Sequence, residues 1–264
     1  MLKELAWRGL ANADRYLQFS RLVPTETDVV LTYHSVGDPR EYGNVSAERF
    51  RTDLAYLTAN FEVVDLADLV EEAADRRRAA VTFDDGTRSV YADALPLLRA
   101  HDVPATVFVV SGTFKCDASG LNATRTLSAD QVAALVDEPL VTIGNHTRTH
   151  PRLSTIDDPA VLEREIEGGK ADLEARFGID VDRFSYPFGD LDRASVEAVR
   201  SGHAVAVTTS PGHVSPDTDP VRLPRIETRR SGTMTRWEAS GLSVRLRSDL
   251  ERLGIDDGRV TRLE

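Results

Sequence analysis

Two histidines in this sequence stand at a spacing that could hold a metal ion. His146 and His150 lie four residues apart in the stretch GNHTRTHP, directly after an apolar run. Two imidazoles at this spacing can bind one cation, whether on a helical turn or in a tight loop. The alternative is a pair of surface histidines in an ordinary loop. If the pair binds a metal, a third ligand must come from elsewhere in the chain.

A pair of adjacent carboxylates can supply that ligand. Asp84 and Asp85 end another apolar run, in AAVTFDDGTRSV. A divalent cation would offset their mutual repulsion, because a metal-bound carboxylate stays ionised while its neighbour can take a proton from water. Asp-Asp-Gly is also a common turn and helix-capping sequence, so the pair alone decides nothing. Together with the two histidines, it predicts one metal ligand and one general base.

The elements that must position these side chains form an alternating pattern. Short apolar, β-branched runs are separated by helical stretches, several of which open with a Ser or Asp cap. The runs cover residues 28–36, 61–66, 79–86, 104–110, 140–146, 183–189, 204–209 and 221–227. This alternation predicts an α/β fold of parallel strands with helical crossovers, and seven or eight strands favour closure into a barrel. Reactive groups of such barrels lie at the carboxyl ends of the strands, so the aspartates and histidines should meet on one rim.

Composition and charge argue against some classes of binding partner. The chain has 264 residues, 41% of them hydrophobic, and a formal net charge of -11. This charge argues against general binding to nucleic acid or to anionic membranes. Charged residues interrupt the apolar ones near the N-terminus, so we expect neither a signal peptide nor a transmembrane segment, and the simplest expectation is a cytoplasmic protein. The expected organisation is one domain at 28–230, with helical extensions at 1–27 and 231–264.

The motifs resemble those of a known family, the polysaccharide deacetylases of carbohydrate esterase family 4, which contain the NodB homology domain. TFDDG matches the first motif of the family, and HTRTH matches the second, His-[Ser/Thr]-x-x-His. SYPFG is similar to the third, Arg-x-Pro-Tyr-Gly, and YHSVGD is similar to the branch that deacetylates poly-N-acetylglucosamine-type polymers. The resemblance covers roughly residues 28–227. It implies a distorted, NodB-like (β/α) barrel.

The resemblance also implies a role for each matched residue. Asp84 would be the general base, and Asp85, His146 and His150 would bind one divalent metal ion. Zinc is the expected metal, although cobalt, nickel or iron could also fit this donor set. The backbone N–H of Phe188 would help to hold the oxyanion. The implied activity is metal-dependent hydrolysis of the N-acetyl group of an N-acetylated saccharide.

The chain departs from the family pattern at two points. Ser185 occupies the place of the third-motif arginine, which orients the base in the family. The closing Leu-x-His motif, whose histidine protonates the leaving amine, is not recognisable. We expect His34, at the end of the first strand, to be the acid or a substrate-contacting group. His213, in the loop after strand 204–209, is the alternative acid and a candidate for substrate binding.

Three further residues are expected at the saccharide subsite. They are Tyr33, Tyr186 and Pro187, which lie next to strand ends. The alternative for the two tyrosines is a place in the core of the protein.

Two other functions remain open. One is a deacylase of a non-sugar amide or of an O-acetyl ester. The other is a metal-bearing saccharide-binding protein without turnover, which the missing arginine and the unplaced acid would favour. An intact Asp84 argues against a pure binding protein, because binding requires no base. The identity of the saccharide and the oligomeric state do not follow from the sequence.

Overall fold

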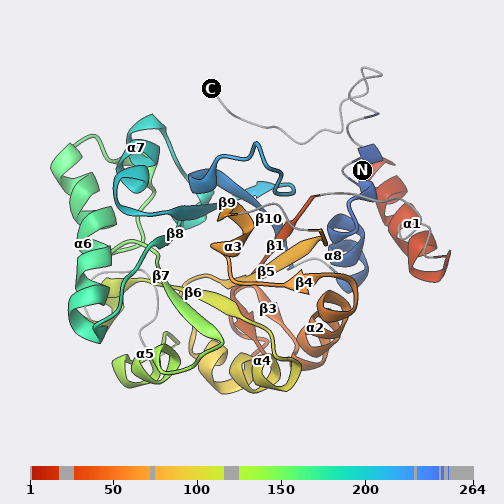
Figure 1. Cartoon of the computed structure of the whole chain (residues 1–264), viewed down its shortest axis with the longest axis horizontal. Helices are drawn as coiled ribbons and strands as arrows, with labels where there is room; N and C mark the ends of the chain where they lie inside the picture. The colour runs from red at the N-terminus through yellow and green to blue at the C-terminus, as the bar shows by residue number, and fades with distance from the viewer. Residues whose placement is uncertain are drawn as a thin grey trace.

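The computed structural model describes residues 2–17, 27–71, 75–115, 125–228, 231–243, 245–246 and 249. At its centre, seven parallel strands form a closed ring, and helices surround this ring (Figure 1). Around the ring the strands are β1 (Val29–Tyr33), β10 (Leu223–Glu227), β9 (Val205–Pro211), β8 (Arg183–Ser185), β7 (Val141–Asn145), β6 (Ala105–Val109) and β5 (Arg78–Phe83). The predicted distorted (β/α) barrel is therefore confirmed.

The ring closes where β1 meets β5. Five consecutive pairs join these two strands, from Val29 opposite Ala79 to Tyr33 opposite Phe83. The short strand β4 (Glu62–Val63) pairs with the other edge of β5 and lies outside the ring. All eight apolar runs of the sequence thus contain a strand, seven of them in the barrel.

Four of the helices between the strands begin at a Ser or Asp cap, as the sequence predicts for several of them. Ser46, Ser128, Asp158 and Asp192 each cap a helix through a side-chain oxygen that accepts a backbone N–H. Such caps satisfy amide groups that have no partner inside the helix. The helices of the barrel wall are α2 (Ala47–Asn60), α3 (Asp68–Glu71), α4 (Leu95–His101), α5 (Ala129–Val136), α6 (Pro159–Phe177) and α7 (Arg193–Gly202).

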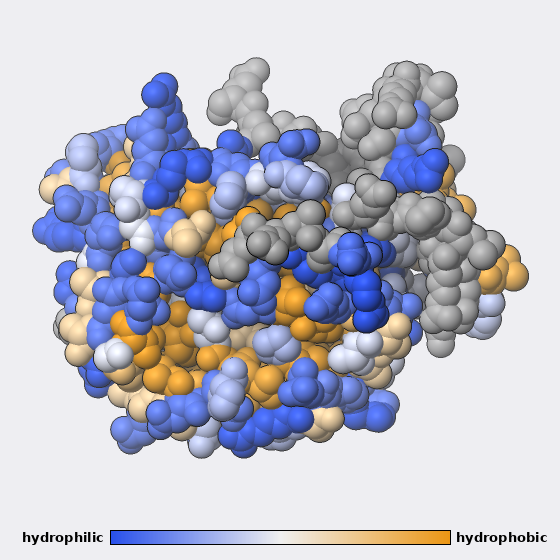
Figure 2. Space-filling view, viewed as in Figure 1, coloured by the Kyte–Doolittle hydropathy of each residue, from blue (hydrophilic) through white to orange (hydrophobic). Residues whose placement is uncertain are grey.

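The strands are buried on both faces. Every residue of β1, β5 and β6 is buried, because the barrel interior covers one face and the helices cover the other. In Figure 2, hydrophilic residues surround the outline of the molecule, and apolar residues show through toward its middle. The helices therefore turn their polar faces to water.

Tyr33 and Tyr186 belong to this core, which corrects their expected place at the saccharide subsite. Both side chains have 0% exposure. The Tyr33 ring lies 4.9 Å from that of Phe50 on α2, and its hydroxyl donates to Asp53 of the same helix. The Tyr186 hydroxyl donates to the carbonyl of Val221 at 3.1 Å. Both tyrosines point out of the barrel toward the helical layer.

The terminal helices pack together at one edge of the barrel. α1 (Leu2–Leu17) lies beside α8 (Gly232–Ala239) in Figure 1, and the rings of Trp7 and Trp237 are 5.9 Å apart. The N-terminal helix thus docks on the body of the protein, whereas residues 250–264 of the expected C-terminal extension lie outside the described residues. No helix in the described part of the chain is both long and apolar enough to cross a bilayer.

Candidate active site

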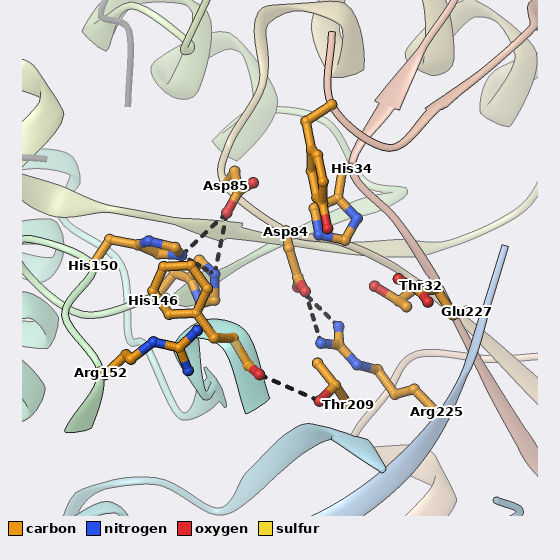
Figure 3. A pocket seen from close by; sticks show the side chains of 12 residues that line it. Thr32, His34, Asp84, Asp85, His146, His150, Arg152, Thr209, Arg225 and Glu227 are labelled. Carbon is orange, nitrogen blue, oxygen red and sulfur yellow. Dashed lines mark hydrogen bonds and ion pairs between the residues drawn. The ribbon is translucent and has the colours of Figure 1, made fainter. Parts of the chain in front are cut away.

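A cavity of about 740 Å³ lies at the carboxyl ends of the barrel strands. His34 follows β1, Asp84 follows β5, His146 follows β7 and Glu227 ends β10, and all four line this cavity. Figure 3 shows Asp85 facing the two histidines on one side, and Asp84 facing Arg225 on the other. The strand ends bring together residues that are up to about 190 positions apart in the chain.

Asp85, His146 and His150 form a compact triangle of potential ligands. The Oδ1 atom of Asp85 is 3.4 Å from Nε2 of His146 and 3.3 Å from Nε2 of His150. The two Nε2 atoms are 3.2 Å apart. Ligand bonds of about 2.0–2.1 Å in a tetrahedral zinc site place neighbouring ligand atoms about 3.3 Å apart. The three side chains therefore fit a zinc-sized ion with a fourth position left open.

The surroundings of His146 prepare it to bind a cation. Its ring is buried, and its Nδ1 atom lies 2.7 Å from the carbonyl oxygen of Ser185. A carbonyl can only accept, so Nδ1 carries the proton and Nε2 keeps its lone pair for the triangle. An orienting hydrogen bond of this kind is typical of metal-binding histidines.

The backbone at this site is unusually strained. Among the described residues, only five that are not glycine have a positive φ, and one of these, Asp102, ends helix α4. The other four are Asp85 (66°), Thr147 (64°), His150 (61°) and Phe188 (60°). Each such residue costs on the order of 1–3 kcal/mol, and strain of this kind concentrates at functional sites. Because of the turn at Asp85, the adjacent carboxylates of Asp84 and Asp85 contact different partners.

Asp84 is held by an arginine that the sequence motifs did not identify. Arg225, on β10, is 1% exposed and uses all five of its N–H groups. Nη1 and Nη2 donate to the two Asp84 oxygens at 2.8 and 2.7 Å. The remaining donors reach the Thr82 hydroxyl, the Ser185 hydroxyl and the Thr208 carbonyl. Arg225 thus contacts, from another strand, the carboxylate that the third-motif arginine was expected to orient.

This ion pair controls the charge of Asp84. Burial acts to raise the pKa of the carboxyl, but the charge and hydrogen bonds of Arg225 outweigh it and lower the pKa to about 2. Asp84 is therefore ionised at neutral pH even though it is 4% exposed. The pKa of Asp85 is also lowered, because hydrogen bonds to His146 and His150 overcome the effect of burial.

Two other predicted residues lie in the cavity. His34 is half-buried there, and its ring is 5.2 Å from that of Tyr42. Phe188 is 53% exposed, and its ring is 4.6 Å from that of His150. The guanidinium of Arg152 lies over the same ring at 4.6 Å. Tyr42 and Arg152 are cavity residues that sequence reasoning missed, because both lie in loops without a motif of their own.

Two predicted substrate-binding residues lie outside the cavity. Pro187 is buried in the turn Pro187–Gly189 and does not line the cavity. His213 is bound on both ring nitrogens, to the Thr27 hydroxyl at 2.8 Å and to the Glu238 carbonyl at 2.7 Å. Its imidazole therefore connects the barrel to α8, which corrects both roles proposed for it.

Comparisons with known proteins agree with this geometry. The model of the polysaccharide deacetylase family matches residues 71–206, just over half of the chain. A Bacillus subtilis protein, YxkH, whose name assigns it to the polysaccharide deacetylases, is 24% identical over 204 residues, which are 75% of this chain and 70% of YxkH. The poly-beta-1,6-N-acetyl-D-glucosamine N-deacetylase of Staphylococcus epidermidis is 24% identical over 159 residues, 57% of this chain and 54% of that enzyme. The chain thus spans little more than half of the second relative.

Solved structures share the fold. The Streptococcus pyogenes deacetylase PplD, in complex with acetate, superposes with a TM-score of 0.71 at 21% identity, over 83% of this chain and 99% of that chain. IcaB from Ammonifex degensii gives a TM-score of 0.71 at 23% identity, over 81% of this chain and 98% of that chain. At these identities the likeness supports the barrel fold.

Proposed function

This chain belongs to the polysaccharide deacetylase family, and from that premise we propose that it hydrolyses the N-acetyl group of an N-acetylated saccharide with the help of one divalent metal ion. One observation carries the proposal. An ionised, buried carboxylate, Asp84, lies next to the Asp85–His146–His150 triangle in a single cavity. A site that only bound saccharide would need no such base.

The residues divide the work as follows. Asp85, His146 and His150 would hold the ion, which when bound polarises the acetyl carbonyl and lowers the pKa of a water molecule toward ~7. Asp84 accepts the proton of the attacking water, and Arg225 keeps its carboxylate charged and oriented. The backbone N–H of Phe188 stabilises the oxyanion that develops on the acetyl oxygen. Support for this last role is the left-handed turn that brings Phe188 to the cavity.

His34 is the histidine best placed to protonate the leaving amine. Two of the six histidines belong to the metal triangle, and three lie outside the cavity. Those three are His101, His203 and His213. His34 lines the cavity, and its Nδ1 atom has no hydrogen-bond partner among the described residues. A protonated imidazole at this position could deliver a proton to the leaving amine.

We expect His34→Ala to lower the rate of deacetylation by about 10²–10⁴-fold, the usual contribution of a general acid or base. The alkaline limb of the pH–rate profile should disappear, because the group whose protonated form is required has been removed. The measurement is the pH dependence of kcat/KM. His213→Ala serves as the control and should keep the profile. Unchanged kinetics in His34→Ala, with loss of the alkaline limb in His213→Ala, would refute this assignment.

The experiment that tests the function is release of acetate from oligomers of N-acetylglucosamine by protein supplied with zinc or cobalt. β-1,4- and β-1,6-linked oligomers, an O-acetyl ester and a simple aryl acetamide should be compared. We expect the N-acetylated oligomers to be the better substrates. Turnover of the ester or aryl amide alone would favour the deacylase alternative. Saccharide binding without acetate release would favour a binding protein. The missing third-motif arginine no longer supports that alternative, because Arg225 pairs with Asp84 instead.

A further inference from the structure

The loop that carries both histidine ligands is strained and needs support. It connects β7 to the turn Leu153–Thr155, and Thr147 and His150 within it both have left-handed backbone angles. Left-handed residues other than glycine persist only when their surroundings fix them. The His150 amide donates to the Thr147 hydroxyl at 3.0 Å, which joins the two strained residues.

Backbone contacts fix the first half of this loop. The amides of Ser111 and Gly112 donate to the carbonyls of Thr147 and Arg148 at 3.2 and 2.8 Å. The Arg148 amide donates to the carbonyl of Glu165, on helix α6, at 3.0 Å. None of these bonds reaches Thr149 or His150. The second half of the loop must therefore be held by side chains.

Glu165 supplies that support with its carboxylate. Its two oxygens accept from the Thr149 amide and from the Thr149 hydroxyl, each at 2.8 Å. The Glu165 side chain is 8% exposed, so these bonds form away from bulk water, where a charged acceptor binds strongly. Thr149 directly precedes His150. Fixing both its amide and its hydroxyl restricts the orientation from which the His150 ring leaves the backbone.

We propose that Glu165 is a positioning residue for the metal ligand His150. This inference rests on the proposed function, because it assumes that the triangle binds a divalent ion. Without the carboxylate, the His150 backbone can relax toward a negative φ and move its imidazole away from Asp85 and His146. The first half of the loop would stay in place, because the backbone hydrogen bonds of Thr147 and Arg148 do not involve the Glu165 carboxylate.

The test compares Glu165→Gln, Glu165→Ala and Thr149→Val in the full chain. The readouts are the zinc Kd, measured by competition with a chromophoric chelator, and the visible absorption of the cobalt-substituted protein. We expect Glu165→Ala to bind zinc about 10–100-fold more weakly, as is typical when a group that orients a ligand is lost. Glu165→Gln keeps one acceptor and should fall between Glu165→Ala and the wild type. In the Glu165→Ala background, Thr149→Val should cause little further loss of zinc affinity, because the two side chains act through one contact.

Glu174→Gln is the matched control. Glu174 lies on the same helix and accepts the Val181 amide at 3.1 Å, but it does not touch the ligand loop. This variant should keep the wild-type Kd and cobalt spectrum. The positioning role is overturned if all three test variants bind zinc within about twofold of the control. If the wild type itself binds no zinc, the proposed function fails together with this inference.

Discussion

Asp84→Asn should keep its metal ion and release acetate about 10²–10⁴-fold more slowly than the wild type. The amide has nearly the shape of the carboxylate but cannot accept the proton of the attacking water. Asp84 makes no contact with the His146 or His150 ligand atoms, and its hydrogen bonds go to Arg225 and Ser185. The measurements are single-turnover acetate release and the metal content of the purified variant.

Asp85→Asn is the contrasting variant and should lose the ion. Its side chain would no longer bring a negative charge to within 3.4 Å of the two imidazoles. Asparagine tolerates the left-handed backbone of position 85, so the variant should fold. Equal metal loss in Asp84→Asn and Asp85→Asn would contradict the division of roles between the adjacent aspartates.

Arg225→Met should destabilise the fold by about 3–5 kcal/mol, because removal of one partner leaves a buried charge uncompensated. It should also raise the pKa of Asp84, because no guanidinium would then oppose the effect of burial on that pKa. The base works in its ionised form, so the acid limb of kcat/KM should move to higher pH. Denaturant unfolding of the metal-free protein and the pH–rate profile measure the two effects.

The double variant Asp84→Asn/Arg225→Met controls for simple loss of packing. It removes both charges and should recover much of the stability lost in Arg225→Met. In the wild type, the lowered pKa means that the ion pair stabilises the fold fully above about pH 4, and this stabilisation is lost as the pH falls toward 2. An Arg225→Met protein with wild-type stability and an unshifted acid limb would show that Arg225 does not orient the base.

The fold was largely predictable because short apolar runs alternate regularly with helical stretches along the chain. The apolar runs are short, most of them are rich in β-branched residues, and four of the helices between them begin at a Ser or Asp cap, so local preference and the global barrel agree. The position of β4 was not predictable in this way. The run 61–66 resembles the barrel strands in composition, and only the pairing of β1 with β5 excludes it from the ring.

The histidine pair of the triangle was predictable from its spacing and the choice of Asp85 from the family motif, whereas the direction of single side chains was not. Tyr33 and His34 are neighbours, yet the first points into the helical layer and the second into the cavity. Successive residues of a strand face opposite sides, so a shift of one residue in the inferred strand reverses the assignment. Tyr186 was misplaced for the same reason.

Arg225 shows a different limit. It lies 141 residues from Asp84 in the chain, and its role depends on a contact across the barrel. The available signal was its charge inside the apolar run VRLPRIE, because a charged residue in a doubly covered strand requires a buried partner. That signal predicts an ion pair but does not identify Asp84 as the partner.

The central claim is that Asp85, His146 and His150 hold one catalytic divalent ion. The most direct measurement is acetate release from N-acetylglucosamine oligomers while chelator-treated protein is titrated with zinc. The activity should rise from near zero and level off at about one equivalent per chain, and Asp85→Asn should show no such rise. Full acetate release by the chelated protein, with no response to added metal, would contradict the claim.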